Sequence, residues 1–277
     1  MNKKILIFSL IIITLFVGCD KNYNLSVHII DVGQGDCILI KTPSNKNMLI
    51  DGGDEDSSKI IKSYLKNKRV KNIDIVIATH PDSDHIGSLD YVIDNFNVES
   101  LYMPKQSTES ESYNNLIDSC NKKNLKIQFL SKNNSLTLDE NCKIQVLSPS
   151  YITDDNNVNS IVLNINYKNN NFLFTGDCEV ENEIDMINSY ELEDIDFLKV
   201  AHHGSNTSSS LDFLKEITPD VAVISCGYKN KYGHPHKSTL DNLKSVDAKI
   251  YRTDTNGSMV FYSDGDKLFT KIKYKAE

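Results

Sequence analysis

The run 79–85, Thr-His-Pro-Asp-Ser-Asp-His, constrains this chain more than any other feature of its sequence. It places two histidines and two aspartates within six residues, directly after the apolar stretch 73–78, which is typical of a buried strand. A solvated acidic turn is one interpretation. A metal site is the other, because imidazole and carboxylate groups bind Zn²⁺ or Mn²⁺ and a cation relieves carboxylate repulsion. The candidate ligands in this run are His80, Asp82, Asp84 and His85.

Two further groups of ligand-type side chains favour the metal interpretation. Asp177 follows the apolar run 172–174, and His202 and His203 follow the apolar run 195–201. Six of the seven histidines of the chain also fall in three close pairs. We therefore expect the ends of several strands to bring these side chains together along one sheet edge.

Short apolar runs separated by polar or glycine residues predict strands, and helical spacing of apolar residues predicts helices between them. Strands are expected near 25–31, 37–42, 47–51, 73–78, 142–148, 160–167, 171–174, 195–201, 222–225, 248–252, 257–262 and 268–274. Helices are expected near 57–67, 86–96, 106–122 and 239–246, and two more are expected to alternate with the strands between 174 and 222. Two mixed β-sheets with helices on their outer faces, in one domain, are the economical packing for this α/β pattern.

Composition limits the partners of the chain. Its 277 residues are 39% hydrophobic, which is enough for a two-layer core. The net charge of −8 argues against a general nucleic-acid coat, although it leaves room for a local basic groove. Outside the N-terminal segment the cysteines are odd in number and lack a Cys-x-x-Cys pair, so we expect no disulfide framework.

The N-terminal segment has the pattern of an export signal. Two lysines at positions 3 and 4 precede the apolar run 5–17, and Cys19 follows a glycine. The run is shorter than the ~20 residues that span a bilayer. Because Cys19 lies where bacterial lipoproteins carry their lipidated cysteine, we expect residues 1–19 to be a lipoprotein-type signal peptide. The protein would then be exported and lipid-anchored to the outer face of the bacterial cytoplasmic membrane, with an uncleaved anchor as the alternative.

The order of the ligand motifs carries a family resemblance. The motifs are His-x-Asp-x-Asp-His at 80–85, Thr-Gly-Asp at 175–177 and His-His-Gly-Ser at 202–205. This order resembles the metallo-β-lactamase superfamily, whose αββα sandwich holds one or two metal ions at the sheet edge. The resemblance implies a single hydrolase domain of this fold over residues 20–277.

Four shorter motifs are similar to the hydrolase domain of the ComEC-like competence proteins within that superfamily. They are Asp-Val-Gly-Gln-Gly-Asp at 31–36, Leu-Ile-Asp-Gly-Gly at 49–53, Lys-Val-Ala-His-His-Gly-Ser at 199–205 and Tyr-Gly-His-Pro-His at 232–236. Together with the ligand motifs they extend the resemblance over about residues 25–265. The sequence shows no counterpart of the membrane channel of full ComEC proteins, so we expect a free-standing domain and do not carry DNA transport over.

The chain departs from the superfamily pattern at two places. Asp82 stands where a second histidine is usual, as is typical of the ComEC-like branch. The usual histidine before the strand that leads to Asp177 is absent, and Asn157, Asn159 and Ser160 occupy that region.

The motifs imply a two-metal hydrolase site, with Zn²⁺ as the expected ion and Mn²⁺ as the alternative. The first ion would be held by His80, Asp82 and Asp177. The second ion would be held by Asp84, His85, Asp177 and His203. His202 is either a further ligand or orients its neighbour. The ions would lie ~3.5–4 Å apart and activate a hydroxide nucleophile. The first set has few ligands, so a single ion is the alternative.

Further residues are expected beside the ions. Asp84 and Asp36 are expected to take part in catalysis, with a hairpin-turn role as the alternative for Asp36. His234 would protonate the leaving group or hold a phosphate, or only stabilise its loop. Asp51 would orient a ligating histidine from behind. Ser205 offers a hydroxyl group beside the metals, or caps a turn.

The sequence thus predicts a metal-dependent hydrolase, with a phosphodiester as its expected substrate because the resembled branch is linked to nucleic-acid degradation. DNA and cell-envelope phosphodiesters are both candidates, and another ester or a lactone is an alternative. The expected partners are this substrate and the membrane, and no obligate protein partner is inferred. A metal-stabilised binding lipoprotein without catalysis is the hypothesis from another class.

Overall fold

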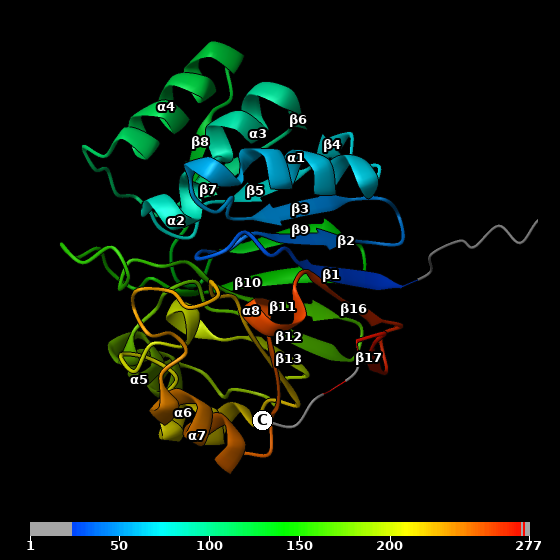
Figure 1. Ribbon diagram of the computed structural model, residues 1–277, viewed down its shortest axis with the longest axis vertical. Helices are drawn as coiled ribbons and strands as arrows, with labels where there is room; N and C mark the ends of the chain where they lie inside the picture. The colour runs from blue at the N-terminus through cyan, green and yellow to red at the C-terminus, as the bar shows by residue number, and fades with distance from the viewer. Residues whose placement is uncertain (1–23, 273, 275–277) are drawn as a thin grey trace, which may run out of the picture.

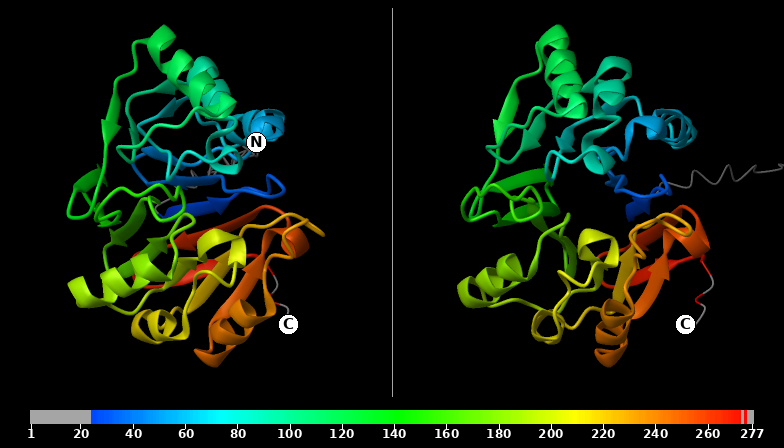
Figure 2. Two further views of the ribbon diagram at one scale, coloured as in Figure 1. Left: turned by 90° about the vertical axis from the view of Figure 1, so that its left-hand side faces the viewer. Right: turned by 60° about the vertical axis from the view of Figure 1, so that its left-hand side comes forward.

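The computed structural model describes residues 24–272 and residue 274. Two large β-sheets pack face to face, and helices cover both outer faces (Figures 1 and 2). This arrangement confirms the expected αββα sandwich of two mixed sheets. The predicted signal peptide, with Cys19, lies outside the described residues.

The first sheet has eight strands in the order β17-β16-β1-β2-β3-β5-β7-β8. These strands are β1 (Leu25–Ile29), β2 (Ile38–Lys41), β3 (Asn47–Ile50), β5 (Ile75–Ile77), β7 (Leu101–Met103), β8 (Ile127–Phe129), β16 (Met259–Ser263) and β17 (Leu268–Thr270). From β17 to β3 neighbouring strands are antiparallel, and from β3 to β8 they are parallel. The parallel half therefore points its carboxyl ends toward one edge.

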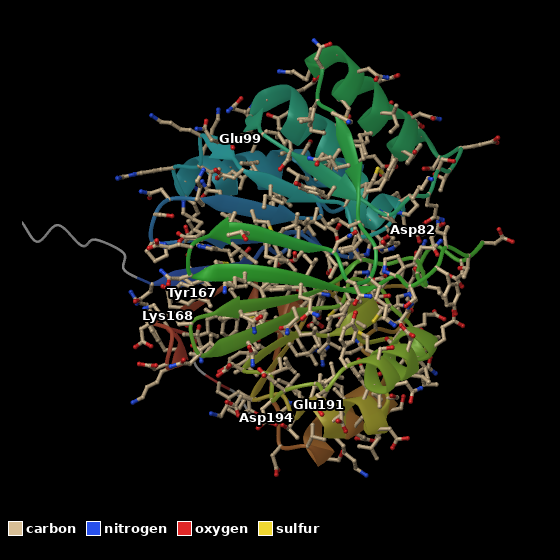
Figure 3. All side chains as sticks on the ribbon, turned by 180° about the vertical axis from the view of Figure 1, so that it is seen from behind. Asp82, Glu99, Tyr167, Lys168, Glu191 and Asp194 are labelled. Carbon is tan, nitrogen blue, oxygen red and sulfur yellow. The ribbon has the colours of Figure 1, made fainter. Side chains whose placement is uncertain are left out.

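The second sheet has seven strands in the order β15-β14-β13-β12-β11-β10-β9. They are β9 (Ser135–Asp139), β10 (Cys142–Ser148), β11 (Val162–Tyr167), β12 (Asn170–Phe174), β13 (Phe197–Lys199), β14 (Val221–Ile224) and β15 (Lys249–Arg252). Strands β12 to β15 are parallel. Seen from behind, the turn at Tyr167 and Lys168 lies at one end of this sheet and Asp82 at the other end (Figure 3). A small third sheet pairs β4 (Asn72–Ile73) with β6 (Asn97–Val98).

Helices close the two outer faces. The face of the first sheet carries α1 (Ser58–Asn67), α2 (Ser83–Ile86), α3 (Leu89–Asn95) and α4 (Glu111–Lys123) (Figure 1). The face of the second sheet carries α5 (Val180–Ser189), α6 (Leu211–Ile217) and α7 (Lys237–Ser245). The shorter segments are η1 (Glu55–Ser57), η2 (Ala201–Gly204) and α8 (Thr253–Asn256). Within residues 24–272, each helix is too short or too polar to cross a lipid bilayer.

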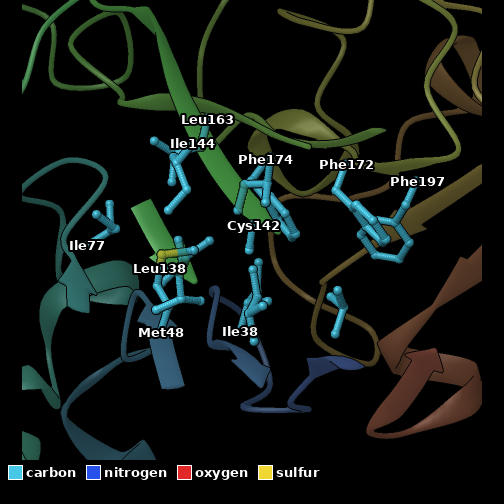
Figure 4. Packing of buried hydrophobic residues seen from close by; sticks show 14 of the residues in the cluster. Ile38, Met48, Ile77, Leu138, Cys142, Ile144, Leu163, Phe172, Phe174 and Phe197 are labelled. Carbon is cyan, nitrogen blue, oxygen red and sulfur yellow. The ribbon is translucent and has the colours of Figure 1, made fainter. Parts of the chain in front are cut away.

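Alternating side chains build the core between the sheets. Along β10, Cys142, Ile144 and Val146 are buried in the core cluster, whereas Lys143 and Gln145 are exposed. Facing side chains from the first sheet complete this layer (Figure 4). This period of two is the pattern of a strand with one covered face. Separate apolar clusters lie under the helices of each outer face. The five described cysteines are buried free thiols.

The structure differs from the sequence-based expectation around residue 87. One helix was expected over 86–96, but α2 ends at Ile86 and α3 begins at Leu89. Gly87 lies at the break, where an added Cβ would come within 2.6 Å of the backbone of Asp54. Gly87 itself keeps helical φ and ψ, and the backbone leaves the helical conformation at Ser88, whose hydroxyl donates to the carbonyl oxygen of Asp54. The sequence analysis also missed β6, β7, β8 and β9. The first three have only two or three residues, and β9 is only partly apolar.

Candidate metal centre

The site forms where the parallel halves of the two sheets end. The run 79–85 follows β5, Asp177 follows β12, and His202 and His203 follow β13. Because β12 and β13 are parallel neighbours, their carboxyl ends leave the sheet side by side. Loops at the carboxyl ends of such strands are the usual place for binding residues in α/β proteins. The structure thus brings together ligand candidates from both sheets at one edge, as the sequence predicts.

Ligand atoms of Asp84, His85 and His203 lie within 4.8 Å of one another, and Asp177 contacts each histidine through a different oxygen. Nε2 of His203 lies 3.3 Å from Nε2 of His85, 3.3 Å from Oδ2 of Asp84 and 3.3 Å from Oδ2 of Asp177. Nε2 of His85 lies 3.3 Å from Oδ1 of Asp177. Metal–ligand bonds of ~2.0–2.1 Å in a tetrahedron separate the ligand atoms by ~3.3–3.4 Å. The residues present therefore fit a bound Zn²⁺ ion.

Hydrogen bonds fix both histidine rings with bare nitrogens facing each other. Nδ1 of His85 lies 2.8 Å from Oδ2 of Asp51, and Nδ1 of His203 lies 3.0 Å from the carbonyl oxygen of Ser225. A carboxylate and a carbonyl only accept, so each Nδ1 carries a hydrogen, and in the neutral ring each Nε2 presents a lone pair. Two lone pairs 3.3 Å apart repel unless a cation or a proton lies between them. This arrangement is the strongest sign of a metal ion.

A second group of ligand atoms lies next to the first. Nε2 of His80 and Oδ1 of Asp177 are buried without a hydrogen-bond partner. Ligand atoms of His80, His85 and Asp177 lie within 4.8 Å of one another. Oδ2 of Asp82 lies 3.7 Å from Nε2 of His80, on a side chain that is 39% exposed. This set could hold the first predicted ion, with fewer protein ligands than the second.

The carboxylates of this cluster stabilise positive charge on the neighbouring groups. Burial disfavours a charged imidazole, yet Asp177 raises the pKa of His85 and of His203 well above its ordinary value. Burial also opposes the ionisation of Asp84, but the hydrogen bond from His203 lowers the pKa of Asp84 to about 2. In contrast, burial and the charge of His85 lower the pKa of His80 to about 4, so His80 is neutral near pH 7. A metal ion would supply the positive charge that two imidazolium groups supply without it.

Asp51 lies directly behind His85. Its Oδ1 accepts a hydrogen bond from the backbone of Thr79 at 2.8 Å, and its Oδ2 accepts from the Thr79 hydroxyl at 2.7 Å as well as from His85. Asp51 is fully buried. Both of its oxygens therefore accept hydrogen bonds, which fits the predicted orienting role.

Asp36 lies behind His203 and does not line the pocket. It is 1% exposed, and its Oδ2 lies 2.7 Å from Nζ of the buried Lys199. Its Oδ1 lies 3.5 Å from Nδ1 of His203. The expected catalytic role does not fit this position, because burial and the ion pair separate the carboxylate from any substrate. The sequence analysis missed Lys199, whose place at the end of an apolar run resembles an ordinary strand terminus.

Ser160 occupies the region of the missing superfamily histidine. Its Oγ accepts a hydrogen bond from the backbone of Asp177 at 3.1 Å and lies 3.3 Å from Nδ1 of His80. Gly176 packs beside it at a φ of +51°, and an added Cβ there would lie 3.2 Å from Cβ of Ser160. The small serine thus holds two ligand residues in place. Asn159 instead bonds to Thr153.

A cavity of about 160 Å³ opens over the ligand atoms. It is lined by Gln34, Asp82, Asp84, Asn157, Asp177, His202, His203, Tyr232 and His234. Larger hollows of about 460 and 620 Å³ lie near Asn169 and Asn171, but none of their lining residues is a histidine or cysteine. The chemistry therefore belongs to the smaller cavity.

The remaining predicted residues lie on the wall or behind it. His202 stands apart from the ligand groups, since its Nε2 lies 3.8 Å from Asp177 and its Nδ1 lies 3.1 Å from the Thr207 hydroxyl. Burial and the neighbouring histidines lower the pKa of His234 to about 4. His234 is thus neutral near pH 7, which suits a hydrogen bond to a phosphate better than proton donation. Ser205 Oγ accepts hydrogen bonds from Thr207 and holds the turn.

Two curated relatives match most of this chain. The ComE operon protein 3 of Bacillus subtilis is 29% identical over 253 residues, which cover 85% of this chain and 32% of that protein. The Recombination protein 2 of Haemophilus influenzae is 30% identical over 240 residues, which cover 84% of this chain and 28% of that protein. The chain thus spans about a third of these relatives or less. They confirm the resemblance to the ComEC-like competence proteins.

A solved structure shows the same fold, and a family model shows the family. The metallo-beta-lactamase fold protein YhfI from Bacillus subtilis has a TM-score of 0.59 and covers 87% of this chain and 100% of its own. At 13% identity this likeness concerns the fold alone. The family model described as "Metallo-beta-lactamase superfamily" matches residues 30–228, which is more than half of the chain. This chain belongs to the metallo-β-lactamase superfamily.

Proposed function

We propose that this protein is a metal-dependent hydrolase of phosphodiesters. The observation that carries the proposal is the pair of Nε2 atoms of His85 and His203, 3.3 Å apart between two carboxylates. Zn²⁺ is the ion that this histidine-rich set favours, with Mn²⁺ as the alternative. A divalent ion bound there would polarise a phosphoryl oxygen and lower the pKa of a water molecule toward neutrality.

Residues of the chain would orient the reactants. Asp84 stays ionised near pH 7, because its pKa is about 2, and it accepts a hydrogen bond from the attacking water. His202, His234 and Asn157 line the cavity together with Asp82, Asp84 and Asp177. Imidazole and amide N–H groups would suit the oxygens of a phosphate that carries negative charge, which favours a phosphodiester over an uncharged lactone.

The proposed substrate is a nucleic acid. The supporting observation is that one relative is named Recombination protein 2, and recombination acts on DNA. Since the chain spans about a third of their length or less, the activities of the whole relatives are not carried over. Cell-envelope phosphodiesters remain the alternative substrate, and another ester or a lactone is the next. We also propose that the protein acts outside the cytoplasmic membrane, anchored by a lipid on Cys19.

Hydrolysis assays test the proposal. The full chain, stripped of metal and reloaded with Zn²⁺ or Mn²⁺, would be assayed with bis(p-nitrophenyl) phosphate and with single-stranded DNA. We expect metal-dependent turnover of both substrates. The Asp84→Ala/His85→Ala variant should lose it, and the remote Lys267→Ala/Lys271→Ala variant should keep it. Turnover of the small ester alone would redirect the proposal to a small or envelope phosphodiester.

A binding protein without catalysis is the second candidate. The observation in its favour is Ser160 in the region of the missing histidine, which leaves the group around His80 short of ligands. It predicts stoichiometric metal binding with no turnover of either substrate. That result would overturn the hydrolase proposal.

A further inference from the structure

One loop beside the cavity exposes aromatic side chains. We call residues 227–236 the tyrosine loop. Tyr228 is 72% exposed and Tyr232 is 52% exposed, although large aromatic rings are usually largely buried. Tyr232 also lines the metal cavity, together with His234. Two exposed aromatic rings at the rim of a proposed active site indicate a surface that binds a ligand.

The side chain of Asn230 holds the tyrosine loop in a fixed shape. Its Nδ2 donates to the carbonyl oxygens of Gly227 and His234 at 3.0 and 2.6 Å. Its Oδ1 accepts from the backbone N–H groups of Tyr232 and His234 at 3.2 and 3.0 Å. One amide thus satisfies four backbone groups of an exposed loop. A loop that is ordered before binding loses little entropy when a ligand arrives.

Two contacts join the tyrosine loop to the cavity. The backbone N–H of Gly227 donates to Oε1 of Gln34 at 3.1 Å, and Gln34 itself lines the cavity. The ring of Tyr232 stacks on His234, with centroids 5.6 Å apart and planes 22° apart. The two exposed rings are therefore held at a set distance from the ligand atoms.

The tyrosine loop belongs to a basic stretch of an acidic chain. Residues 221–240 contain three lysines and no aspartate or glutamate, whereas the whole chain carries a net charge of −8. Nζ of Lys229 lies 5.2 Å from the ring centroid of Tyr228, and Nζ of Lys231 lies 4.9 Å from that of Tyr232. Each exposed ring is paired with one cation. Alternating aromatic rings and cations match the alternation of bases and phosphates along a single strand.

We propose that the tyrosine loop binds single-stranded nucleic acid, with bases stacked on Tyr228 and Tyr232 and phosphates on Lys229 and Lys231. The proposal rests on the proposed phosphodiesterase function, because the loop leads a strand toward the metal cavity. An exposed lysine–tyrosine contact is weaker than base stacking, so the flexible lysine leaves the ring for a phosphate when a base arrives. Stacking requires a free base face, which selects a single strand over a duplex.

Equilibrium binding tests the proposal separately from hydrolysis. The full metal-loaded chain would be titrated with a fluorescent, hydrolysis-resistant phosphorothioate thymidine oligomer of about twelve nucleotides, which suits one binding module. Tyr228→Ala/Tyr232→Ala should raise Kd by about 10- to 100-fold, because each lost stacking contact weakens binding several-fold or more. Tyr228→Phe/Tyr232→Phe should stay within about twofold, since phenylalanine keeps the ring. Equal losses for both double variants would overturn base stacking.

The lysines give a second readout. Lys229→Ala/Lys231→Ala should weaken binding and make the slope of log K against log salt shallower by about 1.4, as expected for two phosphate contacts to a single strand. The matched control is Lys267→Ala/Lys271→Ala, which removes two exposed lysines near β17, on the opposite side of the molecule from α2 (Figure 1). This control should bind as the unaltered chain does. An unchanged slope for the loop variant would contradict the proposal.

The outcomes separate this inference from the proposed function. Oligomer binding that depends on the tyrosines, without turnover of any phosphodiester, supports the tyrosine loop and overturns the hydrolase. Turnover of bis(p-nitrophenyl) phosphate without oligomer binding supports the hydrolase and overturns the loop proposal. Tighter binding to a duplex of equal length than to the single strand also overturns it.

Discussion

At the scale of single residues, the position of the hydrogen on the rings of His85 and His203 determines that a cation can bind between them. Asp51 and the carbonyl of Ser225 accept that hydrogen from His85 and His203, and the facing Nε2 atoms are left to a cation. Residues behind a ligand thus determine which atom the ligand presents. The consequence can be tested on Asp51, because it touches no substrate.

Asp51→Asn should weaken metal binding about 10- to 100-fold, the usual effect of losing the acceptor behind a metal-bound histidine. The neutral amide is a weaker acceptor for Nδ1–H of His85 and lets the ring turn. The measurement is competition for Zn²⁺ with a chromophoric chelator. Asp94→Asn, which alters a partly exposed carboxylate paired with Lys122, is the matched control and should bind as before. Equal affinity in both variants would show that Asp51 does not orient His85.

The buried pair of Lys199 and Asp36 gives a second prediction at this scale. Lys199→Met leaves the Asp36 carboxylate buried without its partner at 2.7 Å, which should cost about 3–5 kcal/mol. Lys199→Met/Asp36→Asn removes both charges and should recover most of the loss. Urea unfolding of the metal-free chain measures both variants. If the double variant is no more stable than the single one, the two residues do not act as a pair.

The sequence alone predicted the candidate metal ligands but not the residues that hold these ligands in place. His80, Asp84, His85 and His203 were predictable because metal-binding side chains are chemically distinctive and followed apolar runs. Lys199 and Ser160 were not predictable, because their roles depend on which groups they meet after folding. Asp36 was expected in the pocket, but it lies behind His203. The sequence shows an aspartate after a glycine turn and does not show in which direction its side chain points.

At the scale of elements, η2 positions both histidines through an unusual backbone. His202, His203 and Gly204 have consecutive φ values of 48°, 54° and 83°. Left-handed residues turn the chain sharply, and non-glycine residues adopt this conformation only where surrounding contacts hold them. The turn leaves the His203 ring in the metal cluster and the His202 ring on the cavity wall.

Gly204→Ala should therefore destabilise the fold and disturb the site. A Cβ there would lie 2.5 Å from Cβ of Pro235, in addition to the cost of a positive φ. We expect a loss of about 2–4 kcal/mol, of which ~1 kcal/mol is conformational. Gly33→Ala is the matched control, because Gly33 has nearly the same φ, +81°, but has open space around it. Thermal unfolding with and without Zn²⁺ compares them. Equal losses would show that the contact with Pro235 contributes nothing.

At the scale of the whole molecule, strand direction explains why distant motifs meet. Ligands that follow β5, β12 and β13 share one edge because each strand lies in the parallel half of its sheet. The apolar runs predicted most strands and the two-sheet architecture. They did not predict the strand order, which depends on pairing between segments far apart in the sequence. The short strands β7 and β8 were missed because tertiary contacts, and not their own pattern, place them in the sheet.

The metal ion should couple stability of the whole fold to pH. In the metal-free chain, Asp177 and the other carboxylates raise the pKa of His85 and His203 above the unfolded value. Stability from these two imidazolium groups is therefore fully present below about pH 6.5 and is lost as pH rises through the raised values. The affinity for the metal ion changes in the opposite direction and rises with pH, because metal binding requires the histidines to be deprotonated.

The rise in Tm that Zn²⁺ causes should thus be larger at pH 8.5 than at pH 6. A free Zn²⁺ concentration of about 100 times Kd stabilises a fold by ~2.7 kcal/mol. At pH 6, protons compete with the ion for the same nitrogen atoms and reduce this gain. Calorimetry of the full chain, with and without Zn²⁺ across this range, measures the difference. His85→Ala/His203→Ala should abolish both the increase in Tm and its dependence on pH. An increase of equal size at both pH values would mean that the ion binds elsewhere than between His85 and His203.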